Sequence, residues 1–352
     1  MLWAAKSPLA ALPCHPMTIP RRQESPRSAA WRADGWGREA WGEPPAGPRS
    51  TALLEQRMAQ NAPYRRALVV ANPIAGRGKG GKAGLELEEG LRSLGVPAEL
   101  YLSRARGDAR SRVASMDPET DLVVSVGGDG TLREVFDGLP DPEVPVGILP
   151  LGTANVLAHE LGLPRDVHET LEILARGKAR PIDVAHVNGN LAFMVTGVGI
   201  DAMAVREVER RRTGPITKWS YVRAVLRVLR KYRPPRLGVE VDGERLPGEY
   251  GFVLVSNTIN YGGLLNLDAD TRLDDGLFEV YLFSARSRWE LATYALRGFL
   301  GRLPGGLGVM KRARQVRVTS DEPVPYQVDG DYRGETPVDI QVADLQYRLL
   351  VP

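Results

Sequence analysis

Three glycine-rich turns, each following a short run of apolar residues, constrain the fold of this chain more than any other feature. They lie in "VVANPIAGRGKGGKAG" at 69–84, "LVVSVGGDGTLREVFDGL" at 122–139 and "GILPLGTANVLAHELGLP" at 147–164. A helical pattern follows each turn. Buried strands that alternate with helices predict a parallel sheet covered by helices. Because the strands of such a sheet end at one edge, we expect the turns to meet there, where open α/β sheets bind ligands.

The first turn alone fits two phosphate-binding motifs, and both fits are incomplete. It has the P-loop spacing, G-x-x-x-x-G-K-[ST], but Ala83 stands where the hydroxyl that binds Mg²⁺ is required. It also has the spacing G-x-G-x-x-G, yet the next strand, at 98–102, ends in Leu102 and Ser103 and lacks the acidic residue of a dinucleotide site. A flexible glycine turn explains the segment at least as well.

The second turn, "GGDGT" at 127–131, is more informative. Its glycines let phosphate oxygens approach the backbone, and the helix that follows offers N–H donors at its N-terminus. Asp129 beside them can hold Mg²⁺ or its water shell. A tight turn capped by Asp129 is the simpler explanation of this motif alone. Three polar glycine turns at one sheet edge together favour a phosphate-binding site.

Changes in pattern along the chain predict its domains. The first 64 residues lack helical or strand periodicity and hold eight basic and five acidic residues, which accounts for the net charge of +3. We expect a disordered tail at 1–64, and a translation start at Met17 or Met58 is an alternative explanation of it. The single Cys14 excludes an internal disulfide framework, and no apolar run approaches the roughly 20 residues of a membrane span. We therefore expect a cytoplasmic protein.

Two ordered domains follow the tail. In 65–180, strands alternate with helices predicted at 81–94, near 107–115, and from Leu132, Thr153 and Val167. After Asp183 the pattern becomes β-rich, as in "YGFVLVSN" and "LFEVYLF", with helices near 216–231 and 287–300. We therefore predict an α/β domain at 65–180 and a mostly antiparallel β domain at 181–352, whose C-terminal strand could pack back on the first domain.

The ordered series of motifs resembles the diacylglycerol kinase catalytic domain family, specifically the soluble bacterial lipid kinases that are similar to sphingosine kinases. The motifs are "NPIAGRGKG", "GGDGTLREV", "PLGTANVLAHELGLP", "PID" at 181–183, "GVGIDA" at 197–202, "LDDGLFEV" at 273–280 and "VDGD" at 328–331. The resemblance covers about 66–350. It implies a parallel-sheet nucleotide-binding domain of the NAD kinase and phosphofructokinase type, followed by an antiparallel β-sandwich. It also implies phosphorylation of a lipid hydroxyl by ATP with Mg²⁺.

The resemblance assigns nucleotide binding to residues of the three turns. These are Asn72, Pro73, Gly127, Gly128, Asp129, Gly130, Thr131, Gly152, Thr153 and Asn155, with Arg77 and Lys79 as phosphate candidates. A solvated basic turn is an equal explanation of either cation taken singly. The family commonly has an acid after the asparagine of the third turn, where this chain has Val156. That departure leaves Asp129 and Asp183 as the candidates for the catalytic Mg²⁺.

Two further roles are implied near the C-terminus. "LDDGLFEV" resembles a second Mg²⁺ loop, with Asp274, Asp275 and the Leu277 carbonyl as ligands, although D-D-G is also a frequent hairpin turn. "VDGD" aligns Asp329 with the family's general base, and Asp331 stands where glutamate is usual. We expect Asp331 to support Asp329.

A basic segment at 206–236 suggests a contact with the membrane surface from which a lipid substrate is taken. Trp219, Val222, Leu226 and Leu229 recur at helical spacing, beside a stripe of Arg223, Arg227 and Lys231. Such a helix fits an anionic lipid surface at the inner membrane face, or a solvated basic face whose apolar stripe packs on the domain. Nucleic acid is not expected, because no aromatic platform accompanies the charge. The sequence leaves open whether the chain forms a homodimer.

Three functions remain open on the sequence alone. The first is a lipid kinase acting on diacylglycerol, a sphingoid base or phosphatidylglycerol. The second is an NAD kinase, which "GGDGT" favours and "PLGTANVLAHELGLP" and the terminal "VDGD" disfavour. The third is a catalytically degenerate nucleotide-binding protein, an alternative that Val156 and Asp331 support.

Overall fold

The computed structural model describes most of the chain after the first 63 residues. The described residues are 64–211, 218–261, 265–267, 270–284, 287, 289–290, 293 and 308–352. The predicted tail, its alternative start sites and most of the helix predicted near 287–300 lie outside them. Within the described part, no helix combines the length and the apolar composition needed to cross a bilayer.

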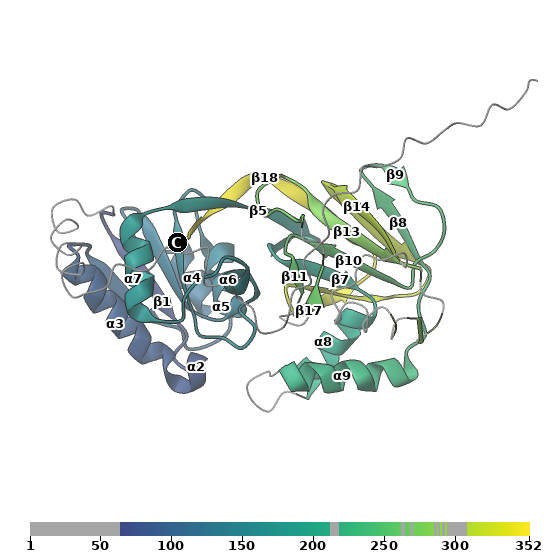
Figure 1. Cartoon of the computed structure of the whole chain (residues 1–352), viewed down its shortest axis with the longest axis horizontal. Helices are drawn as coiled ribbons and strands as arrows, with labels where there is room; N and C mark the ends of the chain where they lie inside the picture. Colours follow the sequence, from purple (N-terminus) through teal and green to yellow (C-terminus); the bar gives the residue numbers. More distant parts are fainter. Residues whose placement is uncertain are drawn as a thin grey trace, which may run out of the picture. The chain divides into compact units, whose positions relative to one another are not determined.

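Four parallel strands form the predicted sheet of the first domain (Figure 1). They are β1 (Ala67–Ala71), β2 (Ala98–Leu102), β3 (Leu122–Gly127) and β4 (Val146–Pro150), in the order β2-β1-β3-β4. All residues of β1, β3 and β4 are buried, which suits their continuous apolar sequences. The carboxyl ends of β1, β3 and β4 lead into the three glycine turns.

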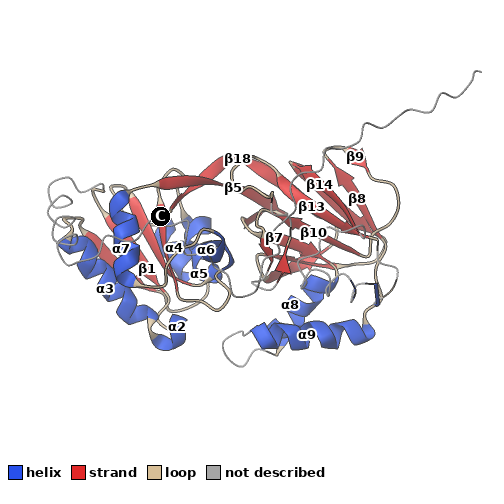
Figure 2. Cartoon of the chain, in the orientation of Figure 1, coloured by secondary structure: helices blue, strands red, loops and turns tan. Residues whose placement is uncertain are grey.

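Helices cover this sheet in two contacting pairs (Figure 2). They are α3 (Gly80–Ser93) with α7 (Val167–Arg176), and α4 (Asp108–Ala114) with α5 (Asp129–Gly138). The two ends of helix α7 are each specified by a capping residue. The Asp166 carboxylate accepts from the amides of His168 and Glu169 at 2.8 and 3.1 Å, and Gly177 ends the helix with a left-handed φ of 61°.

Two helices begin elsewhere than predicted. Helix α5 begins at Asp129 and not at Leu132, so the GGDGT turn is itself the helix N-terminus. Helix α6 (Val156–Glu160) begins three residues after the predicted Thr153, because Asn155 has a left-handed φ of 48° that a helix cannot include. Both shifts place turn residues at helix ends, where backbone amides are unpaired.

The parallel sheet continues into the second half of the chain. The long C-terminal strand β18 (Val338–Leu350) pairs in parallel with β4 at Leu349 and Val146, and antiparallel with β5 (Ala179–Val187). The sheet then runs through β15 (Gln315–Ser320), β8 (Leu237–Val241) and β9 (Glu244–Arg245), while β6 (Asn190–Ala192) pairs with β5. Since this sheet crosses residue 180, we keep the domain boundary there as a proposal.

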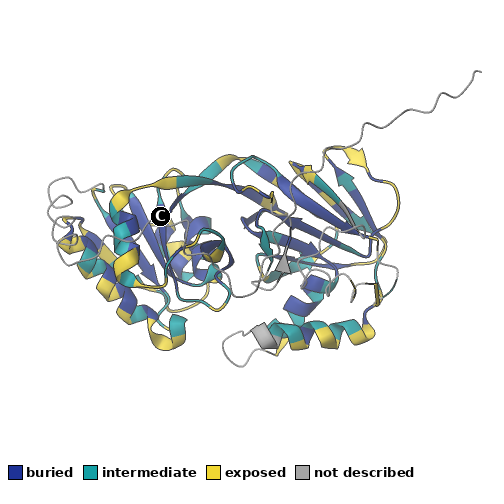
Figure 3. Ribbon diagram, viewed as in Figure 1, coloured by how far each residue is buried: buried dark blue, intermediate teal, exposed yellow. Residues whose placement is uncertain are grey.

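A second, antiparallel sheet completes the sandwich. Its order is β14 (Gly308–Ala313), β13 (Phe278–Phe283), β10 (Phe252–Ser256), β7 (Val195–Val198), β16 (Pro325–Val328) and β17 (Asp331–Glu335). A short ribbon pairs β11 (Asn260–Tyr261) with β12 (Leu265–Asn266). Buried residues of both large sheets form one core, which Figure 3 shows as dark strands. The predicted fold class, a parallel-sheet domain followed by an antiparallel β-sandwich, is therefore confirmed.

Two helices of the second half lie against the antiparallel sheet. Helix α8 (Ile200–Arg210) contacts β7, β16, β17 and helix α9 (Lys218–Lys231). In the first half of the chain, the four-residue segment α2 (Ala75–Gly78) belongs to the first glycine turn. Helix α9 falls within the predicted range. Helix α8 was not predicted, because "GVGIDA" was interpreted only as a motif.

Candidate active site

The three glycine turns meet through backbone hydrogen bonds. The amide of Leu151 donates to the carbonyl of Gly127 at 2.7 Å, and the amide of Gly76 donates to the carbonyl of Leu151 at 2.9 Å. A Cβ added to Gly152 would lie 2.5 Å from the Cα of Gly128. The second and third turns can therefore approach this closely only because both positions are glycine.

Asn155 offers an unused hydrogen-bond acceptor at this junction. Its side chain is 2% exposed, and its amide nitrogen donates to the carbonyls of Gly152 and Pro150 at 2.8 and 3.3 Å. Its Oδ1 has no hydrogen-bond partner in the described part of the chain and lies against Gly128 and Gly152. Buried polar atoms are normally paired, so this oxygen suits a donor from a bound ligand or water.

Asp129 faces both the third turn and the C-terminal motif. Burial raises the pKa of its carboxyl to about 6, although the amides of Asn155 and Val156 lower that pKa. The charge of Asp329 raises it further, so the two carboxylates are close enough to interact. The structure thus brings together two motifs that are 200 residues apart in the sequence.

The remaining turn residues surround this junction or extend from it. Asn72 Oδ1 accepts from the Ile74 amide at 3.2 Å, Pro73 packs at Gly81, Thr131 lies against Gly127, and Gly130 and Thr153 are exposed. Arg77 and Lys79 are exposed too. Arg77 has a φ of 60° between two glycines that are also left-handed, a conformation that costs a non-glycine residue about 1–2 kcal/mol. Such strain is typical of functional turns.

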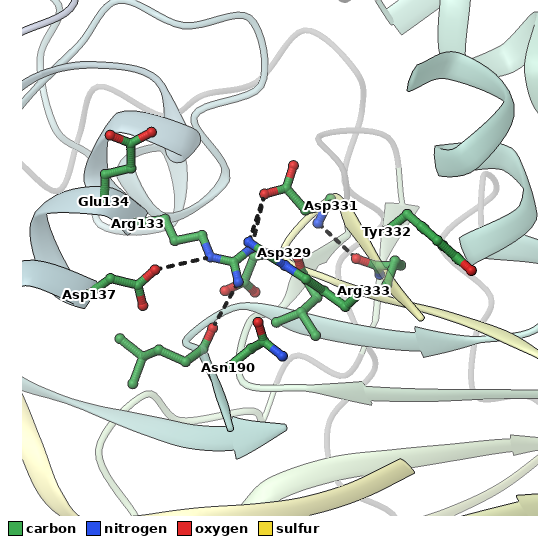
Figure 4. Close-up of polar contacts among 12 residues, drawn as sticks. Arg133, Glu134, Asp137, Asn190, Asp329, Asp331, Tyr332 and Arg333 are labelled. Atoms are coloured by element: carbon green, nitrogen blue, oxygen red, sulfur yellow. Dashed lines mark hydrogen bonds and ion pairs between the residues drawn. The ribbon is translucent and has the colours of Figure 1, made fainter. Parts of the chain in front are cut away.

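Arg133 is the functional residue that sequence reasoning missed (Figure 4). It lies on α5 one turn after Asp129, and it is 3% exposed. Its guanidinium donates to the Val328 carbonyl at 3.0 Å, to Asp331 at 3.2 Å and to the Leu191 carbonyl at 3.4 Å. It therefore joins the GGDGT helix directly to the hairpin that holds Asp329. An arginine among the buried Leu132, Val135 and Phe136 was the available signal.

Asp329 lies at the tip of the hairpin of β16 and β17. It has a left-handed φ of 49°, followed by Gly330 at 85°. Its Oδ1 accepts from the amides of Met194 and Val195 at 2.9 and 2.8 Å, and its Oδ2 accepts from Phe193 at 3.1 Å. Burial raises the pKa of this carboxyl, while Arg133 and the three amides lower it. The carboxylate is thus held in one orientation, with a second lone pair of Oδ2 left for a further donor.

Asp331 is the meeting point of three guanidinium groups. Its Oδ2 accepts from Arg106 at 2.6 Å, from Arg333 at 3.1 Å and from Arg133 at 3.2 Å. Asp331 and Asp329 are linked through Arg133, which interacts with both carboxylates, and the support that we expect from Asp331 stays a prediction.

Asp183 lies with the loop of Asp274 and Asp275, for which the second Mg²⁺ site is predicted. Its Oδ2 accepts from the Gly276 amide at 2.6 Å, and its Oδ1 accepts from the Gln346 side chain at 2.8 Å. Among the described residues, no group of three or more His, Cys, Asp or Glu side chains could hold a metal ion. A common network of Asp183 with Asp129 accordingly stays a prediction.

The loop of Asp274 and Asp275 has one feature that favours Mg²⁺ binding and one that opposes it. Asp274 Oδ1 is buried and accepts no hydrogen bond within the described structure, and such an oxygen is suited to a hard cation. However, Arg272 lies 3.6 Å from this oxygen and Arg180 lies 3.4 Å from Oδ2. Asp275 accepts from the Leu277 amide at 3.1 Å. Carboxylate and carbonyl oxygens are the ligands that Mg²⁺ prefers, but a cation here would have to compete with the nearby guanidinium groups.

Comparison with known proteins identifies the family of this chain. Residues 66–187 match the family model described as diacylglycerol kinase catalytic domain, and residues 194–351 match one described as YegS C-terminal NAD kinase beta sandwich-like domain. A relative from Bacillus subtilis (strain 168), named diacylglycerol kinase, is 30% identical over 281 residues, which are 78% of this chain and 92% of the relative. One of the same name from Staphylococcus carnosus (strain TM300) is 26% identical over 279 residues, covering 78% and 90%.

A solved structure shows the same fold. It is described as a diacylglycerol kinase from Bacillus anthracis str. Sterne, and it superposes with a TM-score of 0.64 at 20% identity, over 82% of this chain and 97% of the other. The matched family model and the relatives define an enzyme of the lipid kinase class. The chain belongs to the diacylglycerol kinase family, and this membership implies the use of ATP.

The first prediction tests the contact made by Arg133. Arg133→Leu leaves the Val328 and Leu191 carbonyls without their donor, and buried unsatisfied acceptors cost about 1–3 kcal/mol each. We expect the free energy of unfolding, measured by urea denaturation, to fall by at least about 2 kcal/mol. Arg106→Leu is the matched control: it removes an exposed contact to the same Asp331 and should cost about 1 kcal/mol or less. Equal, small losses in both variants would contradict the role of Arg133.

Proposed function

We propose that this protein transfers the γ-phosphoryl group of Mg·ATP to the hydroxyl of a membrane lipid, with Asp329 as the general base. One observation carries the proposal. The buried guanidinium of Arg133 joins the GGDGT helix to the Asp329 hairpin, so a nucleotide at the glycine turns would lie near a carboxylate that can accept a proton.

The glycine turns are suited to holding the phosphates. Phosphoryl transfer depends on positioning and charge neutralisation more than on covalent chemistry. The turn glycines allow close backbone approach, the N-terminus of α5 supplies amide donors, and Arg77 and Lys79 are exposed nearby. Asp129 is the residue that would hold Mg²⁺, which when bound neutralises phosphate oxygens.

Asp329 has the properties that a base requires. A general base works best when its pKa is raised toward the operating pH, and burial raises the pKa of this carboxyl. Three backbone amides fix its direction, which limits the reorganisation needed when Oδ2 accepts the proton of the attacking hydroxyl.

The acceptor is proposed from the relatives. Their name supports diacylglycerol as the first lipid to test, while a sphingoid base and phosphatidylglycerol remain alternatives. Incubation with Mg²⁺, labelled ATP, total lipid extract and NAD separates the classes of function. Label in a lipid fraction supports the proposal, and label in NAD would identify an NAD kinase. Bound nucleotide without any transfer would indicate a degenerate binding protein.

The second prediction tests the base. Asp329→Asn keeps the size of the side chain but cannot accept a proton at neutral pH. We expect kcat to fall about 10²- to 10⁴-fold, the usual contribution of a positioned acid–base group, while the Kd for ATP stays near the wild-type value. Asp331→Glu, which restores the family's usual residue, should leave kcat equal or slightly higher. Full activity of Asp329→Asn on a verified lipid acceptor would place the base elsewhere, with Asp183 as the next candidate.

The third prediction tests the proposed second Mg²⁺ site at the loop of Asp274, Asp275 and the Leu277 carbonyl. A ligand that binds only the native state raises Tm by mass action. Mg²⁺ should therefore raise the Tm of the wild-type protein, and the double variant Asp274→Ala, Asp275→Ala should lose much of that rise. The measurement is a thermal melt with and without Mg²⁺. An identical rise in both proteins would leave the loop as a plain turn.

Helix α9 is the proposed contact with the lipid surface, placing the protein peripherally at the inner membrane face. Its exposed side carries Arg223, Arg227 and Lys231, and Leu226 among them is 56% exposed. The helical spacing predicts one apolar stripe that contains Leu226 together with Val222 and Leu229. That prediction needs correction, because Leu229 packs partly against the domain while Leu226 projects from the basic face. An exposed leucine within a basic face suits an interfacial helix.

The fourth prediction tests this surface by charge reversal. Changing Arg223, Arg227 and Lys231 to Glu should weaken binding to anionic phosphatidylglycerol vesicles strongly at low salt and less at high salt, because each basic residue near such a surface contributes about 1 kcal/mol. The control reverses three exposed cations of the first domain, Lys82, Arg110 and Arg176, with the same change in net charge. A cosedimentation assay measures both. Equal loss in the control would indicate a non-specific effect of net charge.

A further inference from the structure

A buried glutamine holds the turn that contains Asp329. Gln327 on β16 is fully enclosed by the sandwich. Its Oε1 accepts from the Gly330 amide at 2.8 Å, and its Nε2 donates to Asp201 Oδ2 at 2.6 Å. Gly330 directly follows Asp329, so one end of the Gln327 side chain fixes the turn while the other end is fixed by Asp201.

Asp201 extends these contacts to helix α9. It lies in the first turn of α8 and is buried. The hydroxyl of Tyr221 on α9 donates to its Oδ1, and this hydroxyl lies 3.4 Å from the hydroxyl of Tyr261 on β11. A Cβ at Gly197 would collide with Oδ2 of Asp201, so the glycine of "GVGIDA" makes room for the carboxylate. Tyr221, Asp201, Gln327 and the Gly330 amide thus form a continuous series, here called the relay.

The relay stabilises the fold less than apolar residues in the same space would, which suggests that its polar groups have a further role. Burial of a carboxylate is unfavourable, and here it raises the pKa of Asp201. Apolar residues of similar volume would fill the same space at lower cost. Its polar atoms instead donate and accept in sequence from α9 to the hairpin tip, a pattern that specifies position.

We propose that Gln327 and Asp201 are positioning residues for the Asp329 turn, and that Tyr221 couples this turn to helix α9. A displacement of α9, as at a lipid surface, then changes the placement of Asp329 relative to the nucleotide. This inference rests on the proposed function of Asp329 as the base.

The experiment uses the full chain, labelled Mg·ATP and dioleoylglycerol in phosphatidylglycerol vesicles. The variants are Gln327→Met, Tyr221→Phe and the double variant, with Tyr232→Phe as the matched control. Tyr232 follows α9, and its buried hydroxyl donates to the Gly251 carbonyl at 3.0 Å, outside the relay. The control therefore loses a similar buried hydrogen bond without touching Asp201. The readouts are kcat, Kd for ATP by calorimetry, and Tm.

We expect each relay variant to lower kcat by about tenfold or more, because a misplacement of about 1 Å at a reacting group can cost up to 10²-fold. The Kd for ATP should not change. The double variant should be no slower than the slower single variant, since residues of one network are not additive. Tyr232→Phe should keep the wild-type kcat despite a similar fall in Tm. A further double variant, Tyr232→Phe with Gln327→Met, should show the kcat of Gln327→Met alone, so that the effects of the two changes on kcat are additive.

Two outcomes would overturn the inference. Either wild-type kcat in Tyr221→Phe, or strictly additive effects of Tyr221→Phe and Gln327→Met, means that α9 and the turn are not coupled. If Gln327→Met does not fold, a comparison of kcat between Tyr221→Phe and the control Tyr232→Phe still tests the coupling of α9 to the turn. Asp329→Asn separates this failure from failure of the proposed function: if it abolishes turnover while the relay variants remain wild type, only the relay is wrong.

Discussion

The candidate active site depends on one buried guanidinium group. Arg133 projects from the helix that begins in the GGDGT turn and binds two backbone carbonyls and one carboxylate of the following domain. Burial of a charged group is costly unless it is hydrogen-bonded, so a shift of the helix relative to the hairpin would break these bonds at a large free-energy cost. The distance from the glycine turns to Asp329 is thereby fixed by a hydrogen-bonded contact and not by the connecting chain.

The shared sheet provides the coarse alignment on which that contact relies. Strand β18 pairs with β4 of the first domain and with β5 and β15 of the second. Phe136 of α5 packs edge-to-face on Phe193 and also contacts Tyr347 of β18, with ring centroids 5.0 Å apart in both pairs. This apolar contact places Phe193 and the next two residues beside α5, and their amides hold Asp329. Packing and hydrogen bonding thus position the same segment from two sides.

The sequence predicted what local pattern and turn chemistry control. The strands and the three glycine turns followed from apolar runs and glycine spacing, and the family motifs indicated Asp129 and Asp329. The sequence could mark Arg133 as a charge among apolar helix residues, but it could not reveal the partners of Arg133, because they lie 58 to 198 residues away. The same is true of the arginines around Asp331 and of the link between Asp183 and Gly276. Helix α8 was missed since a recognised motif masked its periodicity, and Asn155 delayed the start of α6 through a backbone conformation that composition does not display.

The ion pairs around Asp331 bear on how Asp329 can act as a base. Arg133 lowers the pKa of Asp329, and an arginine without a counter-ion beside it would lower that pKa more. Asp331 neutralises part of the charge of Arg133, Arg106 and Arg333, so the pKa of Asp329 stays raised by burial. An aspartate at this position reaches all three guanidinium groups with a single oxygen. In this chain the shorter acid is therefore compatible with the proposed base, because Asp331 contacts the arginines beside the hairpin and balances their charge.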